Sequence, residues 1–130
     1  MSIEYATGSR IGFDDPRLGA ALDALSGTPE AYDALDFGLV VMDLDGTVLY
    51  YNVAEARLSG IQAERVVGLT FFSDVAPCTN NFLVSGRFEE EPVLDETIEY
   101  VFTVKMRPKP VRLRMLKDDR SGRQYLAVKW

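Results

Sequence analysis

The chain has 130 residues, 47% of them hydrophobic, and a formal net charge of −6 at pH 7. This length predicts one domain with a core large enough to enclose a small ligand. The acidic balance argues against sequence-independent nucleic-acid binding, which needs clustered Lys and Arg. No apolar run is long enough to span a bilayer, and the N-terminus does not have the pattern of a signal peptide. We therefore expect neither a nucleic acid nor a membrane as partner.

Cysteine and histidine limit the chemistry further. Cys78 is the only cysteine, and the sequence contains no histidine. A single cysteine cannot form an internal disulfide and fits a reducing compartment, which predicts a cytoplasmic protein. The absence of histidine excludes Cys-His and Ser-His dyads and histidine-containing metal sites. We expect no bound metal and no enzymatic activity.

The first 35 residues carry two helix-start signals. Residues 1–13 show no clear hydrophobic period, and we expect them to wrap loosely. Asp15-Pro16 predicts a helix start, and apolar residues at helical spacing follow it until Gly27, namely Leu18, Ala21, Leu22 and Leu25. Thr28-Pro29 begins a second short helix that ends near Leu35. We interpret residues 1–35 as an N-terminal helical cap that packs on the domain formed by residues 36–130.

The next segment is typical of a β-hairpin, with strands at 37–42 and 47–51 around a turn at Asp43-Leu44-Asp45-Gly46. A strand followed by Asp43-x-Asp45-Gly46-Thr47 also resembles the haloacid-dehalogenase-like phosphatases, in which the first Asp is a nucleophile and the second a general acid. That family needs a doubly wound α/β sheet. A second strand follows Gly46 here, so the phosphatase is the remote alternative.

The middle of the chain predicts short helices. Asn52 with Glu55 three residues later fits a capping box, a purely structural role for Glu55. Ser59-Gly60 ends this helix, and another short one covers residues 63–67 before Gly68. A further helix is expected at 81–90. Between them lies the stretch from Phe71 to Thr79, which contains Cys78.

The last third predicts strands. Apolar and polar residues alternate over 98–106 and 111–116, with a break at 107–110 and a turn at 118–122, before a final strand at 124–130. Two strands, short helices and then three strands predict an α+β fold. We expect a central antiparallel five-stranded sheet with short helices on one face and the helical N-terminal cap. This order is the layout of a PAS domain.

Specific residues extend the likeness over about residues 35–130. They are Tyr51-Asn52-x-Ala54-Glu55, Ser59-Gly60, Val67-Gly68-x-x-Phe71-Phe72-x-Asp74-Val75-Ala76-Pro77-Cys78-Thr79, Glu99-Tyr100-x-Phe102 and Met106. This set resembles the photoactive yellow protein family, and residues 1–35 resemble that family's helical cap. The run from Phe71 to Thr79 is the most specific part of the match.

The resemblance implies a blue-light photoreceptor. Cys78 would hold para-coumaric acid as a covalent thioester, and its phenolate would accept hydrogen bonds from Tyr51 and a protonated Glu55. Trans–cis photoisomerisation would lead to proton transfer from Glu55 to the phenolate and to a signalling change. Ser59 would support Tyr51, and Met106 would speed thermal recovery. The remaining residues implied at the chromophore are Ile61, Phe71, Ala76, Pro77, Thr79, Tyr100 and Phe102.

The sequence departs from the family in three places. Ile61 stands where an Arg is common, the pocket wall near Val104 is altered, and the segment between Cys78 and Tyr100 is shorter. One alternative is a chromophore-free PAS module for ligand binding or interaction, with Cys78 a small buried hydrophobe. The downstream signalling protein is not named by the sequence, and we expect a monomer or weak dimer. Asp74 is interpreted as a turn residue.

Overall fold

A computed structural model describes residues 11–104 and 107–130 of the chain. Its centre is a five-stranded sheet in the order β2-β1-β5-β4-β3, and all neighbouring strands are antiparallel. The strands are β1 (Gly38–Asp43), β2 (Val48–Tyr51), β3 (Val93–Val104), β4 (Arg107–Asp118) and β5 (Arg123–Lys129). The predicted α+β architecture with an antiparallel five-stranded sheet is confirmed.

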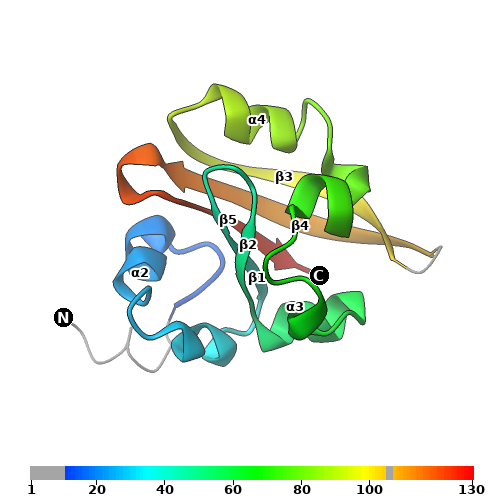
Figure 1. The fold of residues 1–130 in the computed structure, drawn as a ribbon, viewed down its shortest axis with the longest axis horizontal. Coiled ribbons are helices and arrows are strands. Elements are labelled where there is room, and N and C mark those ends of the chain that lie inside the picture. Colours follow the sequence, from blue (N-terminus) through cyan, green and yellow to red (C-terminus); the bar gives the residue numbers. More distant parts are fainter. Residues whose placement is uncertain (1–10, 105–106) are drawn as a thin grey trace.

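Short helices and turns surround this sheet (Figure 1). They are α2 (Leu18–Ala24), η1 (Pro29–Ala34), α3 (Val53–Ser59), η2 (Ala63–Arg65), η3 (Phe71–Val75), η4 (Pro77–Thr79), α4 (Ser85–Glu90) and η5 (Asp119–Ser121). Alternating residues of β1 face two separate cores. Val40 and Met42 pack with residues of η3, α4 and β3, whereas Leu39 and Val41 pack with α2 and the segments that flank it. The sheet therefore separates a helical N-terminal layer from the segment that contains Cys78.

The hairpin turn explains the aspartates of the phosphatase-like motif. Asp43 Oδ1 accepts hydrogen bonds from the backbone N–H of Asp45 at 2.9 Å and of Thr47 at 3.0 Å. Gly46 adopts a φ of 87°, which favours glycine at this turn. The sheet has no parallel pair among the described strands, and β2 rather than a crossover helix follows the motif. The phosphatase alternative is therefore wrong, and Asp43 shapes a turn.

Strands β3 and β4 are longer than predicted, whereas β5 (Arg123–Lys129) keeps the predicted length and lies one residue earlier. β3 begins at Val93, five residues before the predicted start, and β4 begins at Arg107. The predicted break at residues 107–110 is wrong, because Pro108 pairs with Thr103 and Pro110 with Val101 across β3. Pairing of β4 with β5 starts only at Arg112, so the prolines lie where β4 has a neighbour on one side. Proline is tolerated at such positions, because it has no N–H to donate and no described strand lies on the open side to accept one.

Helix boundaries differ in smaller ways. α2 begins at Leu18 because Asp15 and Pro16 form a turn, in which Asp15 accepts a hydrogen bond from the N–H of Leu18. The predicted second and fourth helices are 3₁₀ turns, over Pro29–Ala34 and Ala63–Arg65. α4 starts at Ser85 rather than at residue 81. Local turn bonds thus shorten the helices without changing their order.

Arg114 of β4 anchors the segment that precedes α2. Its guanidinium donates to the carbonyls of Phe13 at 2.8 Å and Asp15 at 2.7 Å. The same group pairs with both carboxylate oxygens of Asp95 on β3, each at 2.9 Å. Ile11 and Phe13 are also buried, so the predicted loose wrapping is wrong for residues 11–13. The rest of that prediction, residues 1–10, lies outside the described residues.

We expect Asp95→Ala to lower the free energy of unfolding by about 2 kcal/mol. The substitution leaves a buried guanidinium with half of its partners, and hydrogen bonds to charged groups contribute about 1.5–3 kcal/mol. The half-exposed Asp95 keeps the effect below that of a fully buried pair. Urea unfolding checks this, with Asp14→Ala as the control, because the pair between Asp14 and Arg112 is exposed on both sides. Equal losses in the two variants would contradict the anchor.

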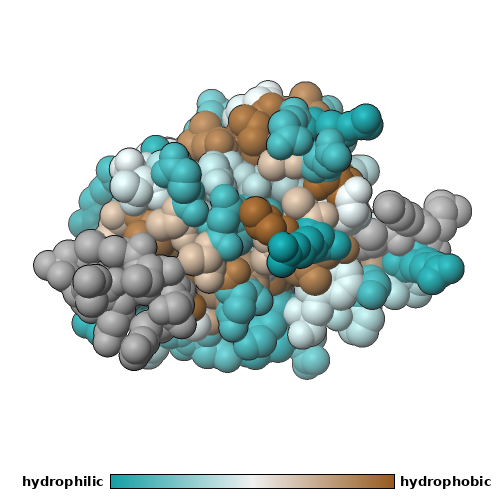
Figure 2. Space-filling model, turned by 90° about the horizontal axis from the view of Figure 1, so that it is seen from below, coloured by the Kyte–Doolittle hydropathy of each residue, from teal (hydrophilic) through white to brown (hydrophobic). Residues whose placement is uncertain are grey.

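The outer surface is mixed in character. Seen from below, hydrophobic residues lie between hydrophilic ones (Figure 2). In the described part of the chain, no helix combines the length and the apolar composition that crossing a membrane requires.

Candidate functional site

A cavity of about 330 Å³ lies between α3, the η3–η4 segment and β3. Such a volume falls within the range of small-molecule sites, about 300–1,000 Å³. Its lining contains nine of the residues that the sequence predicted at the chromophore: Tyr51, Glu55, Ser59, Ile61, Phe71, Ala76, Pro77, Cys78 and Phe102. The lining is mostly apolar and includes a few polar side chains.

Helix α3 places Glu55 against the sheet. Asn52, the N-cap residue, accepts a hydrogen bond from the N–H of Glu55 at 2.9 Å and another from Leu39 of β1 at 2.9 Å. Its amide donates to the carbonyls of Tyr32 and Phe37 at 2.9 and 3.1 Å. The backbone N–H of Asn52 bonds to the carbonyl of Leu39, so the Glu55 side chain does not complete the predicted capping box. The carboxyl group is free to face the cavity.

Glu55 is the buried acid of this site. The residue is 4% exposed, and its Oε1 atom has no hydrogen-bond partner among the described residues. Burial raises the pKa of Glu55 from its ordinary 4.5 to about 8, and the neighbouring Tyr51 hydroxyl opposes this shift. The side chain is therefore neutral at pH 7. A neutral carboxyl group can donate a hydrogen bond to a ligand, which an ionised one cannot do.

Tyr51 and Ser59 form a second polar group beside Glu55. The Tyr51 hydroxyl donates to Ser59 Oγ at 2.7 Å, and this oxygen also accepts from the N–H of Ile61 at 3.1 Å. Burial raises the pKa of Tyr51, and the nearby Glu55 raises it further. Tyr51 is thus a neutral donor at physiological pH. Its proton can turn either to Ser59 or to an acceptor in the cavity, because a hydroxyl rotates.

Cys78 also lines the cavity, and it lies on the short turn η4 (Pro77–Thr79). The residue is exposed, so the interpretation of Cys78 as a small buried hydrophobe is wrong. The preceding segment η3 is a single π-helical turn, in which the N–H of Ala76 bonds to the Phe71 carbonyl at 2.8 Å. Asp74 Oδ2 accepts from the N–H of Thr70 at 3.1 Å, as expected of a turn residue. The chain thereby presents the thiol from a fixed turn.

Two predicted site residues, Thr79 and Tyr100, lie outside the cavity lining, and a third cannot be placed. Thr79 is buried and donates its hydroxyl to the Ala76 carbonyl at 2.6 Å, outside the lining. Tyr100 is also outside the lining and donates to the carbonyl of Cys78 at 2.6 Å. Met106 lies outside the described residues. The assignment of all three as chromophore residues stays a prediction.

Sequence reasoning missed several residues of the site. Val75 and Thr103 belong to the lining. Gly38 lies against the Glu55 carboxyl, so that a methyl group at this position would overlap Oε1. A glycine before a buried strand signals close approach of another group, which was the available clue. Asn81 contacts both Cys78 and Tyr100, and no pattern in the sequence marked it.

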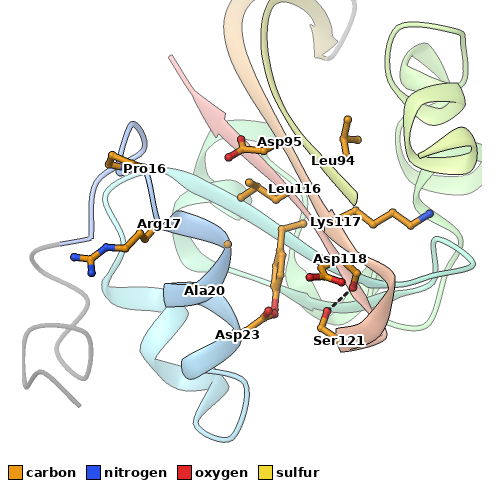
Figure 3. Close-up of a pocket in the computed structure, with 12 residues that line it drawn as sticks. Pro16, Arg17, Ala20, Asp23, Leu94, Asp95, Leu116, Lys117, Asp118 and Ser121 are labelled. Carbon is orange, nitrogen blue, oxygen red and sulfur yellow. Dashed lines mark hydrogen bonds between the residues drawn. The ribbon is translucent and has the colours of Figure 1, made fainter. Parts of the chain in front are cut away.

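A second cavity, of about 360 Å³, lies between α2 and strands β3, β4 and β5 (Figure 3). The polar groups around it are largely engaged within the protein. Asp23 accepts from the hydroxyl of Tyr125, Asp95 pairs with Arg114, and Ser121 donates to the Asp118 carbonyl. In Figure 3 the Lys117 side chain points away from Asp23 and α2, and its amine donates to the Phe88 carbonyl of α4. This cavity lacks the pairing of a thiol with a buried, unpartnered acid.

Comparison with known proteins agrees with this geometry. The PAS fold family matches residues 29–126. A photoactive yellow protein from Halochromatium salexigens is 42% identical over 98 residues, which span 73% of this chain and 78% of that protein. One from Rhodothalassium salexigens is 38% identical over 100 residues, covering 75% and 80% of the two chains. The chain belongs to the photoactive yellow protein family, within the PAS fold.

Solved structures extend this likeness to three dimensions. The photoactive yellow protein domain of the sensor histidine kinase Ppr from Rhodospirillum centenum superposes with a TM-score of 0.76. That domain is 35% identical and is covered to 99%, while 83% of this chain is matched. A PAS domain of an HTR-like protein from Haloarcula marismortui, at 16% identity and a TM-score of 0.60, shares the fold alone. Members of the photoactive yellow protein family are sensory modules, and the present chain is one by sequence and by fold.

We expect Gly38→Ala to displace the Glu55 carboxyl group. The added methyl would overlap Oε1 and come within 3.2 Å of Leu58 Cδ1. Overpacking of this kind destabilises a protein by about 1–3 kcal/mol. Gly27→Ala is the matched control, because a Cβ at Gly27 meets nothing within 4 Å. Denaturant unfolding compares the two variants, and similar small losses in both would show that Glu55 moves freely.

Proposed function

We propose that the protein is a blue-light photoreceptor that carries para-coumaric acid as a thioester on Cys78. One observation carries this proposal: a buried, neutral Glu55 with an unpartnered oxygen lies in the same cavity as the exposed thiol of Cys78. A thiol can form a thioester, and the acid supplies a hydrogen-bond donor at a distance from it. Membership of the photoactive yellow protein family supports the same ligand.

The cavity suits this group in shape and chemistry. Its volume of about 330 Å³ and its aromatic walls, Phe71 and Phe102, fit one aromatic acyl group. The polar end combines Tyr51 and Glu55, two donors that can hold a phenolate oxygen. Ile61 contributes an apolar side chain to the lining. Where a relative carries Arg at this position, a cation would lie near the ligand, so we expect the colour of this protein to differ.

Electrostatics decides which group is charged in the dark. A phenol titrates near 10 and a Glu near 4.3 in water, so solvent would favour the carboxylate. Burial reverses this preference, because the pKa of Glu55 rises to about 8 and the small carboxylate loses its hydration. A conjugated phenolate spreads its charge over a larger group and gains two hydrogen bonds from the protein. Tyr51 and Glu55 thus hold the negative charge on the ligand.

The bound group would supply light absorption and trans–cis isomerisation. Glu55 would then lose its hydrogen-bond acceptor and give its proton to the phenolate oxygen. The carboxylate left behind would be buried without a counter-charge, which is unfavourable. Opening of nearby structure would relieve it. Asn52 connects α3, which carries Glu55, to the carbonyls of Tyr32 and Phe37 in the N-terminal layer, so that layer would respond.

Reconstitution tests the proposal. The apoprotein is mixed with an activated coumaric acid derivative, and the product is examined by mass spectrometry and absorption spectroscopy. We expect one coumaroyl group in place of the thiol hydrogen of Cys78 and a visible band that illumination bleaches reversibly. A colourless, unmodified product would favour the alternative, a chromophore-free PAS module for ligand binding or interaction.

The proposed partner of this chain is a downstream signalling protein. The Ppr match is a domain of a sensor histidine kinase, and we propose that this chain likewise passes its signal to another protein or domain. Cys78 must stay a free thiol until it accepts the acyl group, and a reducing compartment keeps it so. We therefore propose a cytoplasmic location. We further propose residues 1–35 as the cap that loosens on illumination and Met106 as the residue that speeds recovery.

A further inference from the structure

In the part of the chain that the structure describes, the turn that carries Cys78 is hydrogen-bonded to the sheet through one residue. Among the described residues, hydrogen bonds from residues 76–84 to any strand all pass through the hydroxyl of Tyr100 on β3. The other bonds of this segment stay within it or reach η3 and the start of α4, such as Ala76 N–H to the Phe71 carbonyl and Ser85 Oγ to Asn80 Oδ1. Ala76 and Val84 also pack on the core beneath the sheet, but every hydrogen bond that links this segment to a described strand involves Tyr100.

Asn81 completes this connection. The Tyr100 hydroxyl donates to the Cys78 carbonyl at 2.6 Å, and Asn81 Nδ2 donates to the same carbonyl at 3.0 Å. Asn81 Nδ2 also donates to the Tyr100 hydroxyl at 2.6 Å, which closes a triangle. At its other end, Asn81 Oδ1 accepts from the N–H groups of Leu83 and Val84 at 2.9 and 3.2 Å. Both ends of the Asn81 side chain are thus fixed.

The same strand supplies the cavity wall. Phe102 lies two residues after Tyr100 and lines the cavity, and the two rings meet edge to face with centroids 6.0 Å apart. A connection to Tyr100 is therefore a connection to the strand that supplies Phe102 to the cavity wall. Two hydrogen bonds to the carbonyl of Cys78 hold the peptide plane that follows its Cα atom and so restrict its ψ angle. The direction of the Cα–Cβ bond is restricted with it, which narrows the directions that the sulfur can take to the staggered rotamers about that bond.

We propose that Asn81 and Tyr100 are positioning residues, which hold the Cys78 carbonyl and thereby aim the sulfur at the cavity. The role of the sulfur as attachment atom rests on the proposed function. Neither side chain lines the cavity, so both act through Cys78 rather than on the ligand. Asn81 is exposed and Tyr100 half-buried, which leaves the hydrogen bonds as their main contribution.

The substitution Asn81→Asp tests the two ends of the Asn81 side chain separately. Aspartate keeps the oxygen that accepts from Leu83 and Val84, but it cannot donate to Cys78 or Tyr100. Tyr100→Phe removes the hydroxyl and keeps the ring that packs on Phe102. Ser85→Ala is the control, since Ser85 bonds only to Asn80 Oδ1 and the Asn81 carbonyl in the same segment.

Two readouts use the fact that Cys78 is the only cysteine. Carbon-13 at the cysteine carbonyl gives one resonance, whose position reports hydrogen bonding at that oxygen, and iodoacetamide measures access to the thiol in the apoprotein. We expect Asn81→Asp and Tyr100→Phe to shift the resonance and to raise the alkylation rate about fivefold, the factor for one ordinary hydrogen bond. Ser85→Ala should match the wild type. In the loaded protein, both variants should also broaden the infrared band of the thioester carbonyl.

The proposal is overturned if Asn81→Asp and Tyr100→Phe match the wild type in both apoprotein readouts. If Asn81→Ala changes the two readouts and Asn81→Asp does not, Asn81 stabilises only the turn through its oxygen. That result would overturn the proposal as well. If the wild type takes up no coumaroyl group, the proposed function fails. The resonance and the alkylation rate still decide whether Asn81 and Tyr100 aim the sulfur.

Discussion

Glu55→Gln should remove most of the pH dependence of stability in the apoprotein between about pH 4.5 and 8. Because the pKa of Glu55 is higher in the folded chain, at about 8, than its ordinary 4.5, the folded state binds the proton more tightly. Stability from this group is therefore complete below pH 4.5 and is lost as the pH rises toward 8. The full difference is on the order of 5 kcal/mol, at about 1.4 kcal/mol for each pKa unit.

Urea unfolding at several pH values measures this slope. We expect a steep decline in the wild type and a much flatter curve in Glu55→Gln, because the amide does not titrate. Glu64→Gln is the control, since Glu64 is exposed on η2. Parallel curves for the wild type and Glu55→Gln would contradict a neutral buried Glu55. In the loaded protein, glutamine keeps a hydrogen bond but has no proton to give, so we expect a red-shifted band and a weaker late structural change.

Cys78→Ser should abolish pigment attachment altogether. A serine hydroxyl is far less nucleophilic than a thiol at neutral pH, and the sequence has no other cysteine. Cys78 is exposed, so the substitution leaves the core unchanged and should alter stability by less than about 0.5 kcal/mol. The measurement is the absorption spectrum after treatment with activated coumaric acid.

A folded but colourless Cys78→Ser protein supports attachment at the sulfur. The control is Ser59→Cys in the Cys78→Ser background, which restores a thiol inside the same cavity but away from the turn η4. We expect no normal band from this control. A visible, photoreversible band in Cys78→Ser itself would contradict the thioester.

Much of the fold followed from local patterns. Strict alternation predicted the final strands, and the turn residues Asp43 and Gly46 predicted the hairpin that the structure contains. The break expected at residues 107–110 was wrong, because Pro108 and Pro110 lie before the first residue of β4 that pairs with β5. Whether a proline is tolerated in a strand depends on its neighbours in the sheet, which sequence order does not reveal.

The candidate site was predicted by resemblance more than by chemistry. On local grounds Cys78 was most simply a buried hydrophobe and Glu55 a capping residue, and the structure contradicts both interpretations. Gly38 and Asn81 were missed because their roles arise from contacts between segments distant in the sequence or from a turn without regular spacing. Such contacts become visible only when the three-dimensional arrangement is known.

The infrared difference spectrum between the illuminated and dark reconstituted protein tests the central claim most directly. A protonated carboxyl group absorbs separately from carboxylates, so the spectrum reports the charge of Glu55 in each state. We expect a protonated carboxyl band in the dark that disappears on illumination as a carboxylate band grows, with both absent in Glu55→Gln. A reversible colour change without loss of any protonated carboxyl would contradict a neutral Glu55 that gives its proton to the pigment.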